Sequence, residues 1–305
     1  MRKSSILIVI VAILILGTAV YFSLAQKQPN RQSSAPKIAV SIFPLGDIAR
    51  QIAGEEVEIV TILPRGASPH TYSPSPSDLV KMQGSKTLLI IGQGLDDWAA
   101  NLASDLPGSQ VISMDKDIEL LQPPEGILIG EEEEGEEGAD PHYWLSAKNG
   151  KQIARNISEA LVQVAPDKAD IFQANLSQFE NKMDALDAEI KGLFASKANK
   201  KIVTHHDAWQ YFTRDYGLDW IGSVVPSPGK NLTPQQLATL QKLIVDNGIT
   251  TIFIEPQLDP QLSSTLAEDL KLKLVTLDPA GSAEDTKTYD DLLKLNAERI
   301  AATLQ

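Results

Sequence analysis

Residues 166–196, PDKADIFQANLSQFENKMDALDAEIKGLFAS, decide the fold of this 305-residue chain. Apolar side chains recur along the stretch, mostly at three- and four-residue intervals: Ile171, Leu176, Phe179, Met183, Leu186, Ile190 and Leu193. This period predicts a long helix. With a rise of about 1.5 Å per residue, about 30 residues extend roughly 45 Å, enough to run along two domains. We therefore assign residues 166–197 to a linking helix.

Short apolar runs alternate with helical patterns on both sides of the linking helix. The runs before it are residues 37–43, 57–63, 87–91 and 111–113, and those after it are 201–204, 220–224, 251–255 and 274–277. This alternation is typical of parallel α/β sheets. We predict an α/β fold with two parallel-sheet lobes, at residues 37–165 and 198–305, joined by one long rigid helix.

The first 36 residues have the pattern of an export segment followed by a linker. Arg2 and Lys3 precede an apolar run over residues 6–25, and about 20 apolar residues can span a bilayer. Small residues also precede a possible cleavage point after Ala25. Residues 1–25 are thus predicted to be a signal peptide or a membrane anchor, and 26–36 a linker. Both alternatives predict export, to the periplasm or to the outer face of the cytoplasmic membrane with residues 6–25 as anchor.

Composition excludes several classes of function. The formal net charge of −13 disfavours nucleic acid as a partner, because phosphate binding depends on clustered Lys and Arg. The chain has no Cys, which excludes disulfides, Cys-ligated zinc, thiol catalysis and a lipidated N-terminal Cys. Residues 130–140, GEEEEGEEGAD, form a charge block that is predicted to be a loop.

The four histidines of the chain lie beside predicted loops. His70 is in the loop after the second strand, His142 follows the acidic loop, and His205 and His206 follow the strand KIVT. Asp278 follows the strand KLVTL. Ligands of parallel α/β sheets bind at the carboxyl ends of strands. Three imidazoles and one carboxylate suit a zinc ion, so these positions predict a metal site, although spacing alone does not specify it.

The sequence resembles the zinc and manganese solute-binding proteins of bacterial ABC importers, a family that includes metal-binding adhesins. The resemblance covers residues 37–304 and is carried by five segments in order: PRGASPHTYSPSPSD, DPHYWLS, THHDAWQYFTRDYG, IFIEPQL and LDPAG. It implies a C-clamp fold with the metal between the lobes. It also implies His70, His142, His206 and Asp278 as metal ligands, with Glu255 as a residue that supports them. His205 is next to the third ligand position and is expected to be a structural or supporting residue.

The resemblance implies capture of zinc rather than catalysis. The third ligand position is His206, whereas manganese-type members have a Glu there, so Zn²⁺ is expected as the transported ligand and Mn²⁺ is disfavoured. The implied partners are an ABC permease and its separate ATPase, and the chain is expected to be a monomer. A role in cell adhesion is implied by the family's name alone.

Two alternatives remain open at this stage. The first is a manganese or iron solute-binding protein of the same fold. The second is a zinc-dependent hydrolase, which needs an open metal position and a general base, with Glu255 or Asp207 as candidates. The Glu-rich loop at residues 130–140 lacks the His residues that zinc-type members often carry there, so its metal-collecting role stays a hypothesis.

Overall fold

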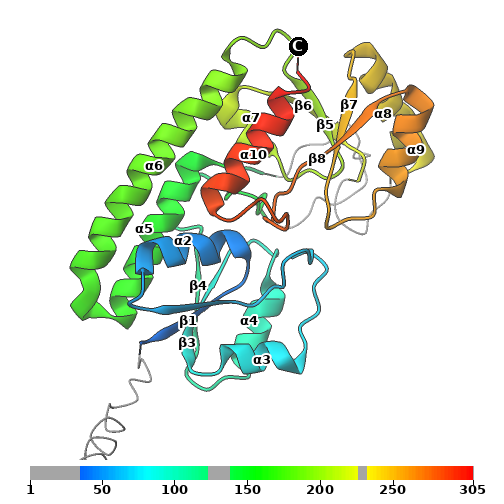
Figure 1. Ribbon diagram of the computed structural model, residues 1–305. Helices are drawn as coiled ribbons and strands as arrows, with labels where there is room; N and C mark the ends of the chain where they lie inside the picture. Colours follow the sequence, from blue (N-terminus) through cyan, green and yellow to red (C-terminus); the bar gives the residue numbers. More distant parts are fainter. Residues whose placement is uncertain (1–34, 123–137, 226–231, 305) are drawn as a thin grey trace, which may run out of the picture. The chain divides into compact units, whose positions relative to one another are not determined.

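Two parallel four-stranded sheets organise the chain (Figure 1). The computed structural model describes residues 35–122, 138–225 and 232–304. The first sheet has the order β2-β1-β3-β4 and the second β6-β5-β7-β8, with every neighbouring pair parallel. The strands are β1 Lys37–Val40, β2 Glu58–Thr61, β3 Ser85–Ile90, β4 Gln110–Ser113, β5 Lys201–Thr204, β6 Asp219–Ser223, β7 Thr251–Ile254 and β8 Lys273–Thr276. The predicted α/β class is confirmed.

Helices connect the strands in the predicted alternation. They are α2 Phe43–Ala53, α3 Pro76–Met82, α4 Asp97–Ser104, α5 Ala147–Val164, α6 Ala169–Ala195, α7 Gln210–Tyr216, α8 Pro234–Asp246, α9 Gln261–Leu270 and α10 Tyr289–Ala301, with a 3₁₀ turn η1 at Pro166–Lys168. The first predicted strand, 37–43, is shorter than expected. It ends at Val40 because Pro44 opens the first turn of α2, where a missing N–H costs nothing.

The long helix α6 buries a slightly different stripe from the predicted one. Of the residues that gave the helical period, Ile171 is 41% exposed and Leu193 is only partly buried against the core. The buried stripe is Phe172, Leu176, Phe179, Met183, Leu186, Ile190 and Phe194. These residues recur at strict three- and four-residue intervals, which keeps them on one face. That face packs against α5, α2 and α10, so α6 contacts helices from both halves of the chain.

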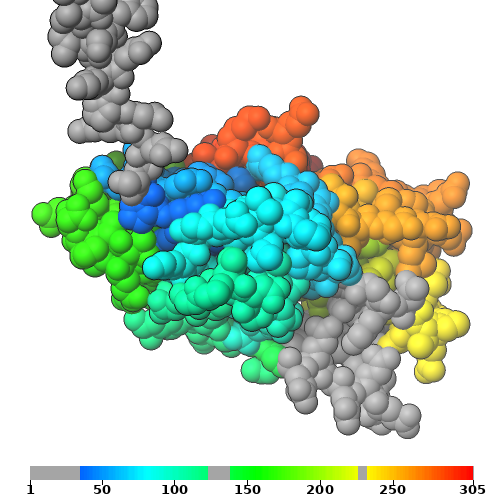
Figure 2. Space-filling view, turned by 90° about the horizontal axis from the view of Figure 1, so that it is seen from below, coloured from blue at the N-terminus to red at the C-terminus, as the bar shows by residue number. Residues whose placement is uncertain are grey.

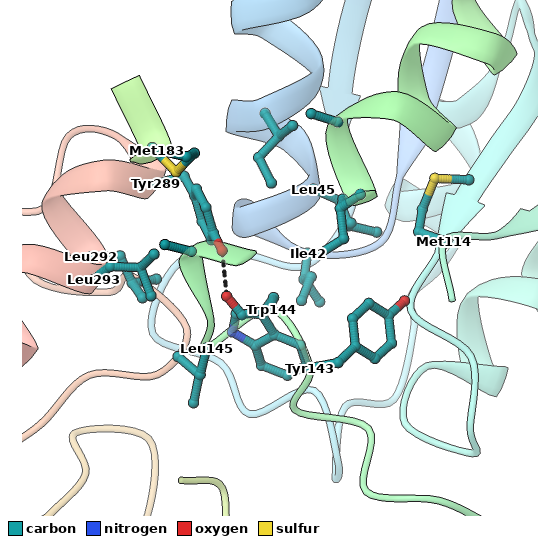
Figure 3. Close-up of a cluster of buried hydrophobic side chains, with 14 of the residues drawn as sticks. Ile42, Leu45, Met114, Tyr143, Trp144, Leu145, Met183, Tyr289, Leu292 and Leu293 are labelled. Carbon is teal, nitrogen blue, oxygen red and sulfur yellow. Dashed lines mark hydrogen bonds between the residues drawn. The ribbon is translucent and has the colours of Figure 1, made fainter. Parts of the chain in front are cut away.

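One hydrophobic cluster includes residues from both halves of the chain. Tyr289 of α10 is fully buried, and its hydroxyl donates to the Trp144 carbonyl (Figure 3) and lies 3.1 Å from the Ser146 carbonyl oxygen. Met183 of α6 belongs to the same cluster. Gly150 of α5 allows the close approach, because a Cβ there would lie 2.6 Å from the Tyr289 hydroxyl oxygen. Through this cluster, α5, α6 and α10 pack against one another.

A second set of contacts joins the loop that carries His70 to the other half of the chain. Arg65 donates a 2.7 Å hydrogen bond to the Thr286 carbonyl, and its guanidinium lies 4.1 Å from the centre of the Phe43 ring. Figure 2 shows the blue-to-cyan segments of the first half in contact with the orange segments of the second half. The two contacts of Arg65 therefore attach the loop to both halves of the chain.

Residues 36–305 form one unit, distinct from residues 1–35. The predicted signal or anchor segment at 1–25, most of the linker at 26–36 and residues 130–137 of the Glu-rich loop lie outside the described residues. Among the helices that the structure describes, none combines the length and apolar character needed to cross a bilayer.

Candidate metal centre

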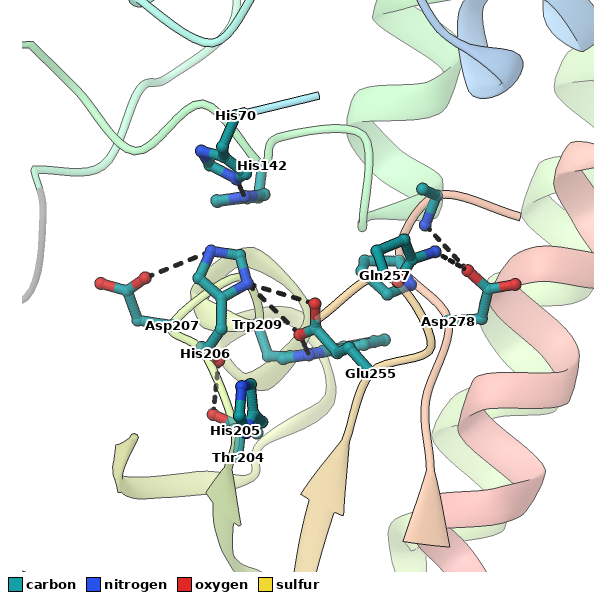
Figure 4. A network of polar contacts seen from close by, with 12 residues as sticks. His70, His142, Thr204, His205, His206, Asp207, Trp209, Glu255, Gln257 and Asp278 are labelled. Atoms are coloured by element: carbon teal, nitrogen blue, oxygen red, sulfur yellow. Dashed lines mark hydrogen bonds and ion pairs between the residues drawn. The ribbon is translucent and has the colours of Figure 1, made fainter. Parts of the chain in front are cut away.

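Three imidazoles from distant parts of the sequence converge in the structure. One ring nitrogen from each of His70, His142 and His206 lies within 4.8 Å of the other two (Figure 4). His142 and His206 are buried, and His70 is partly buried. His70 and His142 belong to the first half of the chain and His206 to the second. The cluster therefore bridges the two halves.

The spacing of the nitrogens fits a small divalent cation. The Nε2 atoms of His70 and His142 lie 3.0 Å apart. Two nitrogens bound to tetrahedral zinc at about 2.0–2.1 Å are separated by about 3.3 Å, so little movement is needed. Nε2 of His206 is buried and has no hydrogen-bond partner among the described residues. A buried imidazole nitrogen that makes no hydrogen bond, with Asp207 Oδ1 3.6 Å away, is available to bind a ligand.

Asp140 fixes the orientation of His142. Its Oδ1 atom lies 2.8 Å from His142 Nδ1 and also accepts the His142 backbone N–H at 2.9 Å. Nδ1 therefore carries the hydrogen, and Nε2 is left as the lone-pair donor that faces His70. A carboxylate behind a metal-ligating imidazole raises its basicity and fixes its tautomer.

Glu255 has the same relation to His206. Both of its carboxylate oxygens lie 3.3 Å from His206 Nδ1, and the Trp209 indole N–H donates to Oε1. The sheet explains this proximity, because β5 and β7 are hydrogen-bonded neighbours and His205 N donates to the Phe253 carbonyl. The strand order of the second sheet reverses between β5 and β7, which is where parallel α/β sheets bind ligands.

The three imidazoles differ in their affinity for protons. Burial alone lowers the pKa of His206, but the charge and hydrogen bonds of Glu255 overcome this effect and raise the pKa to about 9. Burial, together with the neighbouring imidazoles, holds the pKa of His70 well below its usual value, and burial and the charge of His206 do the same for His142. At neutral pH the cluster thus has one imidazolium and two neutral imidazoles.

The three rings line a small cavity of about 20 Å³. This volume accommodates about one water-sized occupant. The residues that line it are Ser68, Pro69, His70, His142, Trp144, His206, Glu255, Gln257, Leu258, Pro279 and Ala280. A single ion fits this space.

Asp278 is not part of the three-imidazole cluster in this structure. Its carboxylate accepts hydrogen bonds from the backbone N–H groups of 280, 281 and 283 and from Gln257 Nε2. The side-chain amide of Asn296 in α10 accepts a hydrogen bond from the Asp278 backbone N–H and donates one to the Asp278 carbonyl. Figure 4 shows Asp278 apart from the imidazoles, with Gln257 between them. The strand order explains the separation, because β8 lies beyond β7 when counted from β5.

The other two residues singled out from the sequence have different positions. His205 is buried next to His206, but its Nδ1 pairs with Ser263 Oγ at 2.7 Å, and the residue is outside the imidazole cluster. The Asp207 carboxylate lies beside the imidazole cluster, with Oδ1 3.6 Å from His206 Nε2.

Asp140 and Gln257 were not among the site residues predicted from the sequence. Asp140 stands two residues before His142 in DPH, and a carboxylate this close to a candidate ligand is a signal that could have been used. Gln257 follows Glu255 by two residues after a predicted strand, which places it at the same edge of the sheet.

Comparison with known proteins identifies the family. Residues 38–303 match the family ZnuA, described as "Zinc-uptake complex component A periplasmic". The chain belongs to this family. The resemblance inferred from the five segments is therefore confirmed. Members of the ZnuA family are solute-binding components of ABC importers and not enzymes, so the zinc-hydrolase alternative is not supported.

Individual relatives include both zinc and manganese proteins. The zinc-binding lipoprotein AdcA of Streptococcus pneumoniae is 28% identical over 97% of this chain, which spans only 60% of the AdcA length. The manganese ABC transporter substrate-binding lipoprotein PsaA of the same species is 29% identical over 97% of this chain and 98% of PsaA. A zinc-bound ZnuA deletion mutant has a TM-score of 0.78 at 28% identity, covering 88% of this chain and 98% of its own.

Proposed function

We propose that this member of the ZnuA family captures Zn²⁺ outside the cytoplasmic membrane and delivers it to an ABC permease that is driven by a separate ATPase. The observation that carries the proposal is the convergence of His70, His142 and His206 within 4.8 Å around a cavity for one ion. Imidazole nitrogens suit zinc better than manganese, which prefers oxygen ligands. Family membership and the zinc-binding relative AdcA support the same metal.

We further propose Asp278 as the fourth ligand and Glu255 as the carboxylate that orients His206. Asp278 supplies the negative oxygen donor that completes a three-imidazole set. It lies outside the imidazole cluster, so we expect the loop at 278–283 to shift toward the cavity on binding. With four protein ligands, the site has no open position for an activated water.

The protein is proposed to act as an exported monomer without nucleic acid as a partner. The relatives AdcA and PsaA are lipoproteins, whereas this sequence has no Cys. We therefore propose that residues 6–25 serve either as a retained anchor or as a cleaved signal. Residues 37–165, 166–197 and 198–305 are proposed as the first lobe, the linking helix and the second lobe.

Calorimetric titration of the metal-free protein with Zn²⁺ and Mn²⁺ tests the function. We expect one Zn²⁺ per chain, tight binding, and a weaker competing affinity for Mn²⁺. His206→Ala is expected to weaken Zn²⁺ at least about 100-fold, since it removes one of the nitrogen donors. His205→Ala is the matched control, because it removes the adjacent buried imidazole that pairs with Ser263, and its Zn²⁺ affinity should stay near wild type.

Two results would contradict this assignment. Equal effects of His205→Ala and His206→Ala on Zn²⁺ affinity would remove His206 from the ligand set. A stable preference for Mn²⁺ over Zn²⁺ would reverse the usual affinity order and favour the manganese or iron alternative, which the relative PsaA also represents. The thermal midpoints of both metal-free variants, measured in parallel, exclude unfolding as the cause.

A further inference from the structure

Gln257 connects the candidate fourth ligand to the wall of the cavity. Its Nε2 atom donates a 2.6 Å hydrogen bond to Asp278 Oδ1 and a second hydrogen bond to Ser282 Oγ. The side chain lines the cavity together with the three imidazoles and Glu255, whereas Asp278 does not. Figure 4 shows the Gln257 side chain between Asp278 and the His206–Glu255 pair. The Gln257 amide therefore occupies the space that separates Asp278 from the imidazoles.

The remaining hydrogen bonds to the Asp278 carboxylate come from its own loop. The backbone N–H groups of 280, 281 and 283 and the Ser282 hydroxyl all donate to it. These donors can move together with Asp278 if the loop shifts toward the cavity. The Gln257 amide belongs to the segment after β7, so its hydrogen bonds to Asp278 Oδ1 and Ser282 Oγ connect the loop to that segment and oppose such a shift.

The other end of the same amide is incompletely satisfied. Gln257 Oε1 is buried and has no hydrogen-bond partner among the described residues. A buried amide oxygen without a partner costs free energy, which a good hydrogen bond at the other end of the group can offset. The bond to a carboxylate is charge-assisted and short, and it is of the stronger kind. Gln257 is thus held in place by its hydrogen bonds to Asp278 and Ser282.

We propose that Gln257 is a positioning residue that holds Asp278 away from the metal position in the metal-free protein and so lowers the affinity for Zn²⁺. The inference rests on the proposed function, with Asp278 as the fourth ligand. A contact made in the metal-free state and broken in the bound state weakens binding by its own free energy. Gln257 therefore makes release of the ion easier and makes its capture weaker.

Gln257→Leu tests the inference in the full chain, with Zn²⁺ itself as the probe. The variant removes the amide and should bind Zn²⁺ about tenfold more tightly in calorimetric competition titrations, the change expected for one charge-assisted hydrogen bond. In the Asp278→Asn background, which keeps an acceptor for the loop N–H groups, the same substitution should leave Zn²⁺ affinity unchanged. Gln235→Leu, an exposed position on α8, is the matched control and should bind as wild type does.

Thermal unfolding separates positioning from a purely structural role. Gln257→Leu should lower the midpoint of the metal-free protein and leave that of the Zn²⁺-saturated protein unchanged, whereas a structural role lowers both. Unchanged or weaker Zn²⁺ binding by Gln257→Leu, or a gain that persists with Asn at 278, would overturn the inference. If the wild-type protein takes up no Zn²⁺, the proposed function fails instead. In that case, the thermal midpoints of the metal-free single and double variants still show whether the substitutions at 257 and 278 are coupled. Strictly additive changes in the midpoint would mean that the hydrogen bond is absent, and this would overturn the inference.

Discussion

His142 Nδ1 lies 2.8 Å from Oδ1 of Asp140, and both side chains are buried. This pair fixes the ring so that its second nitrogen, Nε2, faces His70 at 3.0 Å. The geometry of the candidate metal centre therefore depends on a carboxylate that does not itself face the cavity. Glu255 likewise lies 3.3 Å from His206 Nδ1, although it also lines the cavity, so two of the three imidazoles are oriented by an acidic side chain.

Removal of the Asp140 carboxylate should weaken Zn²⁺ without removing a ligand. We expect Asp140→Ala to reduce affinity about 10- to 100-fold, because His142 loses its fixed tautomer and orientation. Asp140→Asn keeps an oxygen acceptor without the charge and should have a smaller effect. Calorimetry measures both, with Asp105→Asn at the exposed end of α4 as control. Wild-type affinity in Asp140→Ala would show that the ring is held by other contacts.

The affinity for Zn²⁺ should rise with pH up to about 9, the value to which Glu255 raises the pKa of His206 against the effect of burial. Below this pH the ion must displace a proton from His206, so the affinity should fall about tenfold per pH unit. His70 and His142 have lowered pKa values and add little to this slope at neutral pH. Calorimetry at pH 7.5 in two buffers of different ionisation enthalpy should report about one proton released per ion.

Glu255→Gln provides the control for this pH dependence. The substitution keeps an acceptor for His206 and Trp209 but removes the charge, so the pKa of His206 should fall. We expect fewer protons released per Zn²⁺ at pH 7.5 and a flatter dependence of affinity on pH. An unaltered proton count would mean that the released proton comes from another group.

Two glycines in helices should respond in opposite directions to replacement by alanine. Gly150→Ala introduces a Cβ 2.6 Å from the Tyr289 hydroxyl oxygen and 2.7 Å from its ring, so overpacking should destabilise the protein by about 1–3 kcal/mol. Gly192→Ala in α6 meets no atom within 4 Å and should stabilise by about 0.5–1 kcal/mol through helix propensity. Urea denaturation of the metal-free protein measures both. A destabilised Gly192→Ala would contradict this account.

The contact of Arg65 with the opposite half of the chain should support the His70 loop. Arg65→Ala removes the 2.7 Å bond to the Thr286 carbonyl and the contact with the Phe43 ring. We expect faster amide exchange at residues 66–71 and a loss of Zn²⁺ affinity of about 1 kcal/mol, or about fivefold. Lys86→Ala removes the same charge from an exposed position and serves as control. Unchanged exchange in Arg65→Ala would assign the rigidity of the loop to its own contacts.

Most of the fold could be predicted from hydrophobic periodicity. Strand and helix positions follow from apolar runs and the helical period, and β5 spans residues 201–204 as predicted. The buried face of α6 was harder to predict, because Ile171 and Phe172 are adjacent in the sequence and both are apolar. Only the packing of α5, α2 and α10 decides that Phe172 faces inward and Ile171 stays exposed.

The candidate site was less predictable than the fold. The sequence indicates His70, His142 and His206 because each follows a strand or lies beside a turn, but it carries no information on which strands are neighbours. The pairing of β5 with β7 brings Glu255 beside His206, whereas Asp278 is one strand further away. The hydrogen bond from Gln257 to Asp278 depends on side-chain geometry, which periodicity does not encode.

The donors gathered around the cavity are all nitrogen and oxygen atoms, and the sequence contains no thiol. Oxidation by peroxide and disulfide exchange both require a thiolate sulfur as the nucleophile, and these donors include none. Zinc held here would stay bound under oxidative conditions that empty sulfur-ligated zinc proteins. Outside the cell membrane, where oxidants are common, this chemistry makes loading depend on acidity and on metal supply rather than on redox state.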